Sequence, residues 1–313
     1  MGASGIMSIS TLTVEARTAQ GLGRWKDYLE LTRPRISLLV LVVVAASAYL
    51  ASWGQLNPWL MLHTLLGTAW IAASASALNQ WFERDTDSRM ERTSDRPLPA
   101  GRMSGIQVLG FAVLTVVLGL AQLAWQVNPL TALLGLLTWA VYGFAYTPLK
   151  IRTPHNTLVG AISGALPVWM GWAAVSTSQL PWQDVRAWSL LVLLFLWQFP
   201  HFMAIAWIYR DQYRQAGIKM WTVVDATGRR AAVQSVLGAL ALLPISFVPA
   251  LYLPVTVAGY YLTVAFVLGL VQLIFAVRFL LHLNNHTARG LLRATLVYLP
   301  ALLILLVVST LVP

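Results

Sequence analysis

Long apolar stretches, separated by shorter polar ones, run through most of the chain. Nine of them reach the roughly 17 to 25 residues that a helix needs to cross a membrane. They lie at about 36–52, 58–81, 105–125, 129–146, 156–177, 187–209, 231–250, 256–281 and 291–312. Glycine or proline interrupts the fifth and the seventh, which membrane helices tolerate when neighbouring helices satisfy the freed backbone groups. Strand-like alternation is absent, so the pattern predicts an all-α polytopic membrane protein with nine transmembrane helices.

The composition agrees with a membrane protein. The chain is 58% hydrophobic and only 10% charged, a balance that is typical of membrane proteins rather than soluble domains. Residues 1–24 are rich in Ser, Thr and Gly. They are predicted to form a disordered cytoplasmic tail ahead of a single transmembrane domain over residues 25–313. The absence of cysteine excludes disulfides, thiolate nucleophiles and cysteine-based metal sites.

The basic residues are distributed unevenly between the two sides of the predicted bundle. Of the 21 Lys and Arg residues, Arg186 alone falls in one set of alternating loops, and all the others fall in the opposite set or the N-terminal segment. Loops rich in Lys and Arg stay in the cytoplasm. We therefore expect a bacterial cytoplasmic (inner) membrane protein with its N-terminus in the cytoplasm and its C-terminus outside. This topology explains the net charge of +10 better than nucleic-acid binding does.

A dense group of acidic residues follows the second apolar stretch. Asn79, Glu83 and Asp87 are spaced four residues apart, which places them on one face of a helix. Carboxylate and amide oxygens in this arrangement suit Mg²⁺, which proteins usually hold through one or two carboxylates together with substrate phosphates. Arginines are interspersed with these acids, and metal ligands beside arginines indicate a diphosphate site. Asp85 and Glu91 lie off this face, and we expect them to pair with arginines.

A second long polar stretch, between the sixth and seventh apolar stretches, offers further charged side chains. Asp211 is a candidate ligand for a second metal, and Asp225 is a weaker one. Three basic residues are suited to bind phosphate, namely Arg210, Arg214 and Lys219. Taken alone, this stretch also fits a solvated loop at the membrane surface. Because both polar stretches lie on the same side, we expect a site between two halves of the bundle, in a central cavity open to the cytoplasmic side.

The motifs together resemble a known family. Asn79-x-x-x-Glu83-x-x-x-Asp87, followed by Met90-x-Arg92-Thr93-x-x-Arg96-Pro97, resembles the first signature of UbiA-type intramembrane prenyltransferases. Further matches are Thr32-Arg33-Pro34-Arg35, Tyr146-Thr147-x-x-Lys150, Phe199-Pro200-His201-Phe202 and Asp211-x-Tyr213. The resemblance extends over about residues 25 to 300, and the family has nine transmembrane helices. Many members have an acidic residue at the start of a second Asp-rich motif, where this chain has His201-Phe202. The branch of the family that farnesylates heme shares this departure.

The resemblance implies a Mg²⁺-dependent enzyme. It transfers a farnesyl group from farnesyl diphosphate to a vinyl group of heme b, with addition of water, which gives heme O and diphosphate. Heme b is then a substrate rather than a prosthetic group. Asn79, Glu83 and Asp87 are assigned to one Mg²⁺ and Asp211 to a second. The candidates for binding the diphosphate are Arg35, Arg84, Arg92, Arg96, Lys150 and Lys219, among which we favour Arg96 and Lys150.

Aromatic and histidine side chains near the same helix ends are candidates for the prenyl and heme pocket. Aromatic faces stabilise a carbocation, although Trp and Tyr at helix ends also form the ordinary interfacial belt. His201 lies in an apolar helix beside Pro200. It either contacts heme, as an iron ligand, or forms a hydrogen bond between helices at the proline kink. The aromatic candidates are Trp81, Phe82, Tyr142, Tyr146 and Trp207.

Two alternative functions stay open. A sister enzyme of the same superfamily would prenylate a quinone or chlorophyll precursor, which two complete Asp-rich motifs would favour. A membrane transporter or channel would carry its acidic residues near the middle of the membrane, whereas those of this chain gather at the predicted cytoplasmic edge. Beyond the lipid bilayer, the resemblance implies heme A synthase or a terminal oxidase as partners, and it implies no nucleic acid.

Overall fold

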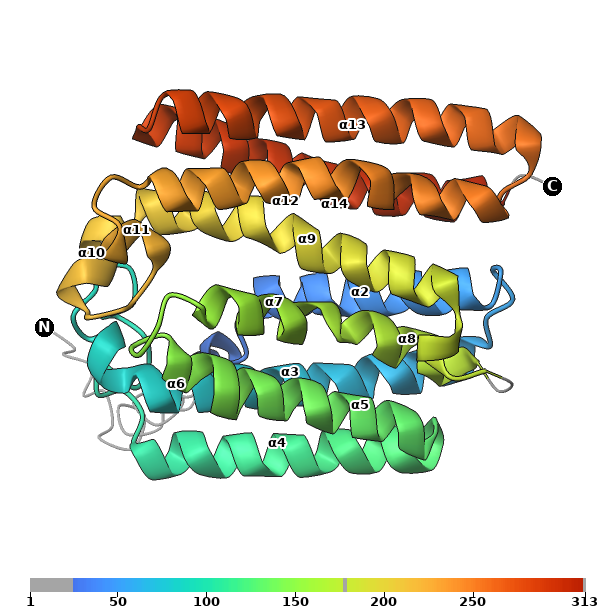
Figure 1. Cartoon of the computed structure of the whole chain (residues 1–313). Coiled ribbons are helices and arrows are strands. Elements are labelled where there is room, and N and C mark those ends of the chain that lie inside the picture. Colours follow the sequence, from blue (N-terminus) through green and yellow to red (C-terminus); the bar gives the residue numbers. More distant parts are fainter. Residues whose placement is uncertain (1–24, 177–178, 312–313) are drawn as a thin grey trace, which may run out of the picture.

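The structure is a computed structural model that describes residues 25–176 and 179–311. The segment predicted to be a disordered tail, residues 1–24, lies outside the described residues. Helices dominate the described part of the chain, and no strand occurs in it. Figure 1 shows the long helices lying side by side. The predicted all-α class is therefore confirmed.

Nine helical segments of the described chain are long and apolar enough to cross a membrane, as the hydrophobic pattern predicts. They are α2 (Pro34–Ala51), α3 (Pro58–Asp87), α4 (Gly105–Gln126), the α5–α6 segment (Pro129–Leu149), the α7–α8 segment (Asn156–Val175), α9 (Val185–Ile208), the α12–η3 segment (Arg229–Tyr252), α13 (Val255–Leu281) and α14 (Asn285–Ser309). A short helix at residues 25–31 precedes α2, and others lie between the spanning segments at η2 (Pro181–Gln183), α10 (Arg210–Gln215) and α11 (Trp221–Val224).

The two segments that the sequence marks as weak are both interrupted. The fifth breaks at Leu166, between α7 (Asn156–Ala165) and α8 (Pro167–Val175). The seventh passes from α12 (Arg229–Phe247) into the 3₁₀ turns of η3 (Val248–Tyr252). Proline lies at or near each break, and proline lacks the N–H that continues the hydrogen-bond pattern of a helix.

The fourth segment contains a change that the hydrophobic pattern does not predict. Between α5 (Pro129–Ala140) and α6 (Thr147–Leu149), the chain forms the π-helix η1 (Val141–Tyr146). Pro148, in α6, cannot donate the next backbone hydrogen bond of a regular helix. Single π-helical turns are frequent at functional sites, and this one lies at the end of the segment that carries Lys150.

The second segment, α3, continues beyond its apolar part. The apolar run stops at about residue 81, whereas the helix ends at Asp87. The acidic residues therefore lie on the helix itself, as their four-residue spacing requires. At the other end, the Asn57 side chain accepts a hydrogen bond from the backbone N–H of Trp59 and caps the helix.

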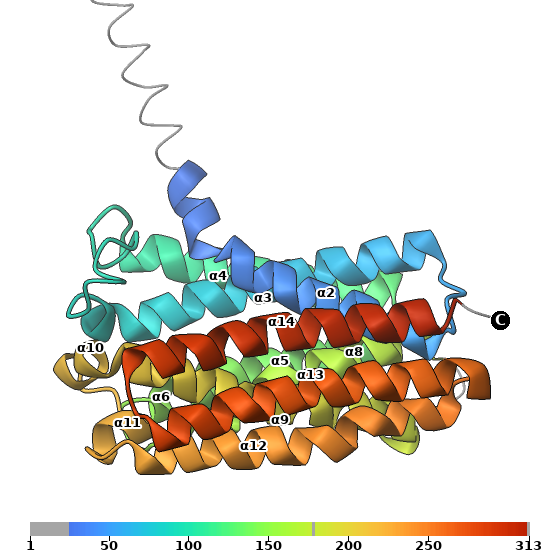
Figure 2. The same ribbon diagram turned by 90° about the horizontal axis from the view of Figure 1, so that it is seen from above.

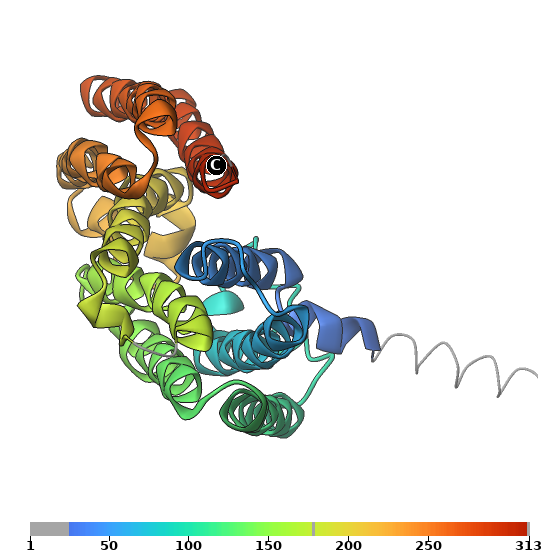
Figure 3. The same cartoon turned by 90° about the vertical axis from the view of Figure 1, so that its right-hand side faces the viewer.

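The polar stretches gather at one end of the bundle. Figure 1 shows α10, α11 and the turn after α3 together at the left. We call this the basic end, because its loops carry most of the Lys and Arg residues. Seen end-on, the spanning helices follow the chain around an arc (Figure 3). Helix α14 packs on α9 and α13 and approaches α2 (Figure 2), while α2 packs on α3 and α8.

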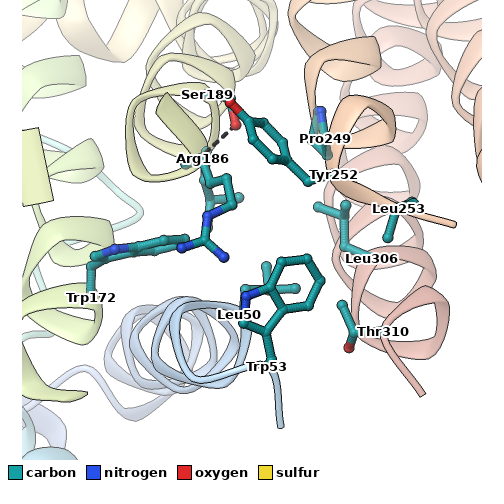
Figure 4. Close-up of a pocket in the computed structure, with 11 residues that line it drawn as sticks. Leu50, Trp53, Trp172, Arg186, Ser189, Pro249, Tyr252, Leu253, Leu306 and Thr310 are labelled. Atoms are coloured by element: carbon teal, nitrogen blue, oxygen red, sulfur yellow. Dashed lines mark hydrogen bonds between the residues drawn. The ribbon is translucent and has the colours of Figure 1, made fainter. Parts of the chain in front are cut away.

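At the opposite end, an arginine is held between two tryptophans (Figure 4). The Arg186 guanidinium lies 5.1 Å from the ring centroid of Trp53 and 5.2 Å from that of Trp172. Its Nη2 also donates to an Asp184 carboxylate oxygen at 2.6 Å. These rings and the arginine line a pocket of about 430 Å³ with mostly apolar walls. The cluster joins the ends of α2, α8 and α9, and its charge is balanced locally, which is typical of a structural contact.

We expect Arg186→Gln to destabilise the protein without abolishing its activity. The variant loses two cation–π contacts and leaves the Asp184 side chain, which is 9% exposed, without its charged partner. The expected loss is about 1–3 kcal/mol of unfolding free energy. Thermal unfolding compared with Arg229→Gln, an exposed arginine at the basic end, measures it. Equal melting temperatures for the two variants would contradict the structural role.

The same contact predicts a pH dependence. Burial opposes ionisation of Asp184, but hydrogen bonds from the side chain and backbone of Arg186 outweigh it and hold the pKa of that carboxyl below its ordinary value. A group whose pKa is lowered by folding stabilises the protein above its unfolded pKa and loses this effect as the pH falls through its folded pKa. The stability difference between the wild type and Arg186→Gln is therefore greatest near neutral pH and shrinks in acid.

Candidate active site

The last turns of α3 carry the three residues of the predicted metal-binding face. Asn79 and Asp87 are almost completely buried, at 0% and 1% exposure, and the Glu83 side chain is 12% exposed. Their spacing puts them in line along one face of the helix at the basic end. Buried carboxylates require partners, and the neighbouring loops supply cations.

Glu83 is paired with Lys150, which follows α6. Its Oε1 accepts a hydrogen bond from the Lys150 Nζ at 2.6 Å, and the ammonium lies 4.5 Å from the ring centroid of Tyr146. Burial disfavours the charged ammonium, but the Glu83 carboxylate outweighs burial and raises the pKa of Lys150. The lysine therefore keeps its charge. One turn earlier, Asn79 Nδ2 donates to Thr147 Oγ1 at 3.1 Å and ties α3 to α6.

Asp87 is paired with Arg96, from the loop that follows α3. Arg96 Nη1 donates to Asp87 Oδ2 at 2.5 Å. Thr93 Oγ1 donates to the backbone carbonyl of Asp87 at 2.9 Å, so the loop folds back onto the end of the helix. Burial and the charge of Arg33 lower the pKa of Arg96, although Asp87 opposes this. A guanidinium stays protonated at neutral pH even so.

Arg33 completes this cluster, although the sequence analysis did not select it. Its charge acts on Glu83, Asp87 and Arg96. Its Nε and Nη2 are buried and have no hydrogen-bond partner among the described residues. It precedes α2 with a φ of 48°, a left-handed conformation that costs about 1–2 kcal/mol outside glycine. Strain of this kind gathers at functional sites. The predicted neighbour, Arg35, is instead exposed.

Two buried oxygens in the cluster are unpaired and fit a bound cation. Asn79 Oδ1 and Asp87 Oδ1 accept no hydrogen bond from any residue that the structure describes, whereas buried polar atoms are normally satisfied. Across the described ranges, no three His, Cys, Asp or Glu side chains gather closely enough to hold a metal by themselves. This donor set agrees with Mg²⁺, which takes few protein ligands and completes its coordination with phosphate oxygens and water. The unpaired donors of Arg33 suit the phosphate.

The structure does not bring Asp211, the predicted ligand of a second metal, into this cluster. It lies on α10 with its side chain 65% exposed and contacts Arg214 at 3.1 Å and Arg210 at 4.0 Å. Exposed pairs of this type contribute little to stability, which agrees with the interpretation of a solvated loop. Asp225 accepts a hydrogen bond from Thr227, which lowers its pKa, and another from the first turn of α12. It therefore helps to start that helix.

The two polar stretches nevertheless meet through other residues. The Arg92 guanidinium lies 4.7 Å from the ring centroid of Tyr209 and 6.0 Å from that of Tyr213. Met90 packs against Ile218. These contacts join the loop after α3 to the segment around α10, so both polar stretches belong to one surface at the basic end.

A backbone contact also links Lys150 to the second polar stretch. The backbone N–H of Lys219 donates to the carbonyl of Lys150 at 2.6 Å. Asn156, at the start of α7, donates from Nδ2 to the carbonyls of Lys219 and Thr153, both at 2.7 Å. Lys219 therefore holds the Lys150 loop with its backbone, while its own side chain is exposed.

The other predicted residues on α3 lie away from the Asn79–Asp87 face. Arg84 is 50% exposed and contacts Asp85 at 3.7 Å, and its guanidinium lies 5.4 Å from the Trp81 ring centroid. Trp81 packs with Leu31 and with residues of α4. These side chains therefore support the helix from its other side. Among the six predicted diphosphate ligands, the structure places Arg96 and Lys150 in the cluster.

Two tyrosines lie beside Lys150. The rings of Tyr142 and Tyr146 are 5.5 Å apart. Gly160 of α7 makes room for Tyr146, because a Cβ at this glycine would lie 2.7 Å from Cε2 of the tyrosine. Phe82 is 38% exposed, and Trp207 packs in the hydrophobic cluster of α9, α12, α13 and α14. Tyr142 and Tyr146 are thus the aromatic candidates that the structure brings to the acidic cluster.

His201 makes a hydrogen bond between helices. Its Nδ1 lies 3.0 Å from Thr295 Oγ1 on α14, and its ring stacks on Trp197 at 4.6 Å. Thr295 Oγ1 donates its own proton to the carbonyl of Leu292 at 2.7 Å. The threonine therefore accepts from Nδ1–H, which leaves the lone pair on Nε2. The helix–helix hydrogen bond that the sequence allowed is present.

Within the described residues, buried oxygens without hydrogen-bond partners lie beside Lys150, Arg96 and Arg33 at one end of a bundle of membrane-spanning length, an arrangement that suits an anionic ligand. The model of the UbiA prenyltransferase family matches residues 39–309. The chain belongs to this family and is a membrane-embedded prenyltransferase.

Similar sequences cover nearly the whole chain. A protoheme IX farnesyltransferase of Solibacter usitatus (strain Ellin6076) is 43% identical over 286 residues, which are 88% of this chain and 95% of that protein. A protoheme IX farnesyltransferase of Rhodopirellula baltica is 41% identical over 291 residues, which are 89% of this chain and 98% of that protein. The matches therefore extend over most of the chain rather than over a single motif.

Solved structures share the fold at low sequence identity. A digeranylgeranylglyceryl phosphate synthase superimposes with a TM-score of 0.75 and 14% identity, covering 91% of this chain and 98% of that one. A UbiA homologue from Archaeoglobus fulgidus, bound to DMAPP and Mg²⁺, has a TM-score of 0.63 and 16% identity, covering 90% and 99%. The described part of the chain therefore has the fold of solved intramembrane prenyltransferases.

Proposed function

We propose that this enzyme transfers a farnesyl group from farnesyl diphosphate to a vinyl group of heme b, with addition of water, to give heme O and diphosphate. The observation that carries the proposal is the cluster in which oxygens of Asn79 and Asp87 and donors of Arg33 have no hydrogen-bond partner among the described residues. The oxygens suit the metal of a metal–diphosphate complex, and the Arg33 donors suit its diphosphate. The acceptor, heme b, follows from the protoheme IX farnesyltransferases that are similar over most of the chain.

In this proposal, Mg²⁺ is held by Asn79, Glu83 and Asp87. When bound, it neutralises negative charge that develops on the diphosphate as the allylic C–O bond breaks. Lys150, Arg96 and Arg33 would bind the phosphate oxygens. Fixed cations that are already desolvated stabilise the leaving group without a cost of reorganisation.

The farnesyl cation that results needs an environment that is apolar and favourable to positive charge. Tyr142 and Tyr146, beside Lys150, present aromatic rings that stabilise a cation. The heme vinyl group supplies the electron pair for the new C–C bond, and water then adds to the carbocation on the heme side chain and loses a proton.

His201 is the proposed contact of the heme acceptor. The hydrogen bond to Thr295 fixes the ring and leaves a lone pair on Nε2. A histidine held in this way through its other nitrogen is the usual arrangement of a metal ligand, and it suits the iron of a heme. Asp211 is exposed and paired with arginines. In this proposal it would bind a second metal only when the substrate is bound.

We also propose a location and an orientation of the protein in the membrane. The basic end faces the cytoplasm of a bacterial inner membrane, following the distribution of Lys and Arg. A central cavity, as the sequence predicts, would then open towards the cytoplasm, where water-soluble Mg²⁺ would reach α3. Heme A synthase or a terminal oxidase would receive the product.

The proposal predicts a metal-dependent product that mass spectrometry can identify. Purified protein incubated with heme b, farnesyl diphosphate and Mg²⁺ should yield a heme heavier by one farnesyl group and one water. A chelator should stop turnover, and excess Mg²⁺ should restore it, because the unpaired oxygens of Asn79 and Asp87 then regain their cation. Unchanged heme together with prenylation of a quinone precursor would move the enzyme to a sister activity. Absence of diphosphate release with every acceptor would overturn the site assignment.

A further inference from the structure

The last part of the chain carries basic residues that no acid balances. After Asp225 the sequence contains neither Asp nor Glu. Arg278 lies near the end of α13, and His286, Arg289 and Arg293 lie in the first turns of α14. All four belong to the basic end, and in the described part of the chain none of them forms an ion pair with an acid. This edge of the protein is therefore open to an anionic partner.

A groove between α13 and α14 begins at these basic residues. It holds about 810 Å³ of empty space, with His286 and Arg293 among its lining residues. Further from the basic end its walls are apolar, formed by Phe275, Val271, Leu268 and Val297. Val271 is 43% exposed and Val297 is 62% exposed. Because these residues lie in spanning helices, the groove opens to the surrounding lipid.

A glycine shapes the groove where the charged part meets the apolar part. Gly290 of α14 lies opposite Phe275, and a Cβ at this glycine would lie 3.1 Å from the Cδ1 and Cε1 atoms of the ring. That distance is tighter than ordinary side-chain contacts. The absence of a side chain at Gly290 therefore lets the aromatic ring lie against α14 and form one wall.

The groove is separated from the candidate active site by α14 itself. Thr295, which binds His201, is fully buried. Arg293 precedes it by two residues and is exposed. Two residues correspond to about 200° of rotation around a helix, so the groove and the His201 contact lie on different sides of α14. A ligand in the groove is not placed for farnesyl transfer.

We propose that this groove binds an anionic phospholipid from the leaflet at the basic end. The phosphate group lies between Arg293 and His286, and one acyl chain follows Phe275, Val271 and Leu268 into the membrane. Basic pockets between transmembrane helices recognise anionic headgroups in this manner, and arginine binds phosphate through paired N–H donors. A flexible chain matches a long, lipid-facing groove with aliphatic walls better than a rigid planar molecule does.

The test is native mass spectrometry of the full-length, delipidated protein titrated with phosphatidylglycerol or with phosphatidylcholine of the same acyl chains. The wild type should bind phosphatidylglycerol more tightly. Arg293→Gln should weaken that binding about five-fold, as expected from the loss of one cation near the headgroups, and should leave phosphatidylcholine binding unchanged. Arg229→Gln removes the same charge from an exposed position on α12, outside the groove. It should bind both lipids like the wild type.

A second pair of variants tests the acyl-chain part of the groove without altering charge. Val271→Trp should fill the groove and weaken phosphatidylglycerol binding. Leu270→Trp should not, because Leu270 is 38% exposed but does not line the groove. Equal losses in Arg229→Gln and Arg293→Gln, or equal affinity of the wild type for both lipids, would overturn the proposal. The proposal would also be overturned if heme b displaced bound phosphatidylglycerol from the wild type but not from Val271→Trp.

Discussion

Asp87→Asn lowers turnover by at least about 10²- to 10³-fold, which is the expected cost of losing one group that stabilises the leaving charge. The amide keeps the size of the carboxylate and still accepts a hydrogen bond from Arg96, so the fold is preserved. It loses the negative charge that, in the proposed mechanism, would attract Mg²⁺ to Asp87 Oδ1, an oxygen with no hydrogen-bond partner among the described residues. Steady-state assays of diphosphate release, carried out over a range of Mg²⁺ concentrations, measure the effect.

The matched control is Asp85→Asn. This acid lies two residues away, is 80% exposed and contacts Arg84 at 3.7 Å. It carries the same charge but lies off the Asn79–Asp87 face. We expect turnover within about two-fold of the wild type, since exposed pairs of this kind contribute little. If both variants lost activity equally, the acidic segment would act through its overall charge. If Asp87→Asn failed to insert while Asp85→Asn did not, the Asp87–Arg96 pair would be structural rather than catalytic.

The arrangement of the helices follows closely from the sequence. A run of apolar residues of membrane-spanning length has few folding options in lipid, because the backbone must satisfy its own hydrogen bonds. The same reasoning predicts the break at Pro167 and the irregular end of the seventh segment. The face shared by Asn79, Glu83 and Asp87 follows from helix geometry alone, once the helix is known to continue to Asp87.

The partners of the acidic residues did not follow from the sequence in the same way. Lys150 lies 67 residues after Glu83, and its placement depends on how α6 packs on α3. The π-helix before it results from a local competition between hydrogen-bond patterns, which hydropathy does not report. The family motifs supply part of this missing information about the partners, because they distinguish Lys150 and Arg96 from the other basic residues.

Arg33 and Arg35 show a choice that the sequence does not decide. Both belong to one short motif on the basic side of α2, and charge and spacing cannot distinguish them. Arg33 has a left-handed backbone with a φ of 48°, and its Nε and Nη2 are buried, whereas Arg35 is exposed. An unusual φ at a non-glycine residue is set by tertiary contacts and leaves no signature in residue type. The sequence alone therefore does not distinguish the two arginines.

The acidic cluster as it stands is neutralised by its own cations. Glu83 and Lys150 are paired, as are Asp87 and Arg96, while Arg33 adds a further positive charge. A buried charge is costly without a partner, so these pairs keep the site folded when no substrate is bound. In the proposed mechanism, a bound metal would add positive charge beside the carboxylates and the diphosphate would add negative charge beside the cations.

Arg33→Gln is expected to raise the KM for farnesyl diphosphate and to lower kcat/KM about 10- to 100-fold. Charge-assisted hydrogen bonds contribute about 1.5–3 kcal/mol each, and the Nε and Nη2 of Arg33 are unpaired donors within the described residues. Because Lys150 and Arg96 already balance the acids, the loss of Arg33 should leave thermal stability nearly unchanged. Arg35→Gln, two residues away and exposed, should retain a wild-type KM. Reversed behaviour of these two variants would show that the motif reaches the diphosphate through Arg35, and that the unpaired donors of Arg33 serve another purpose.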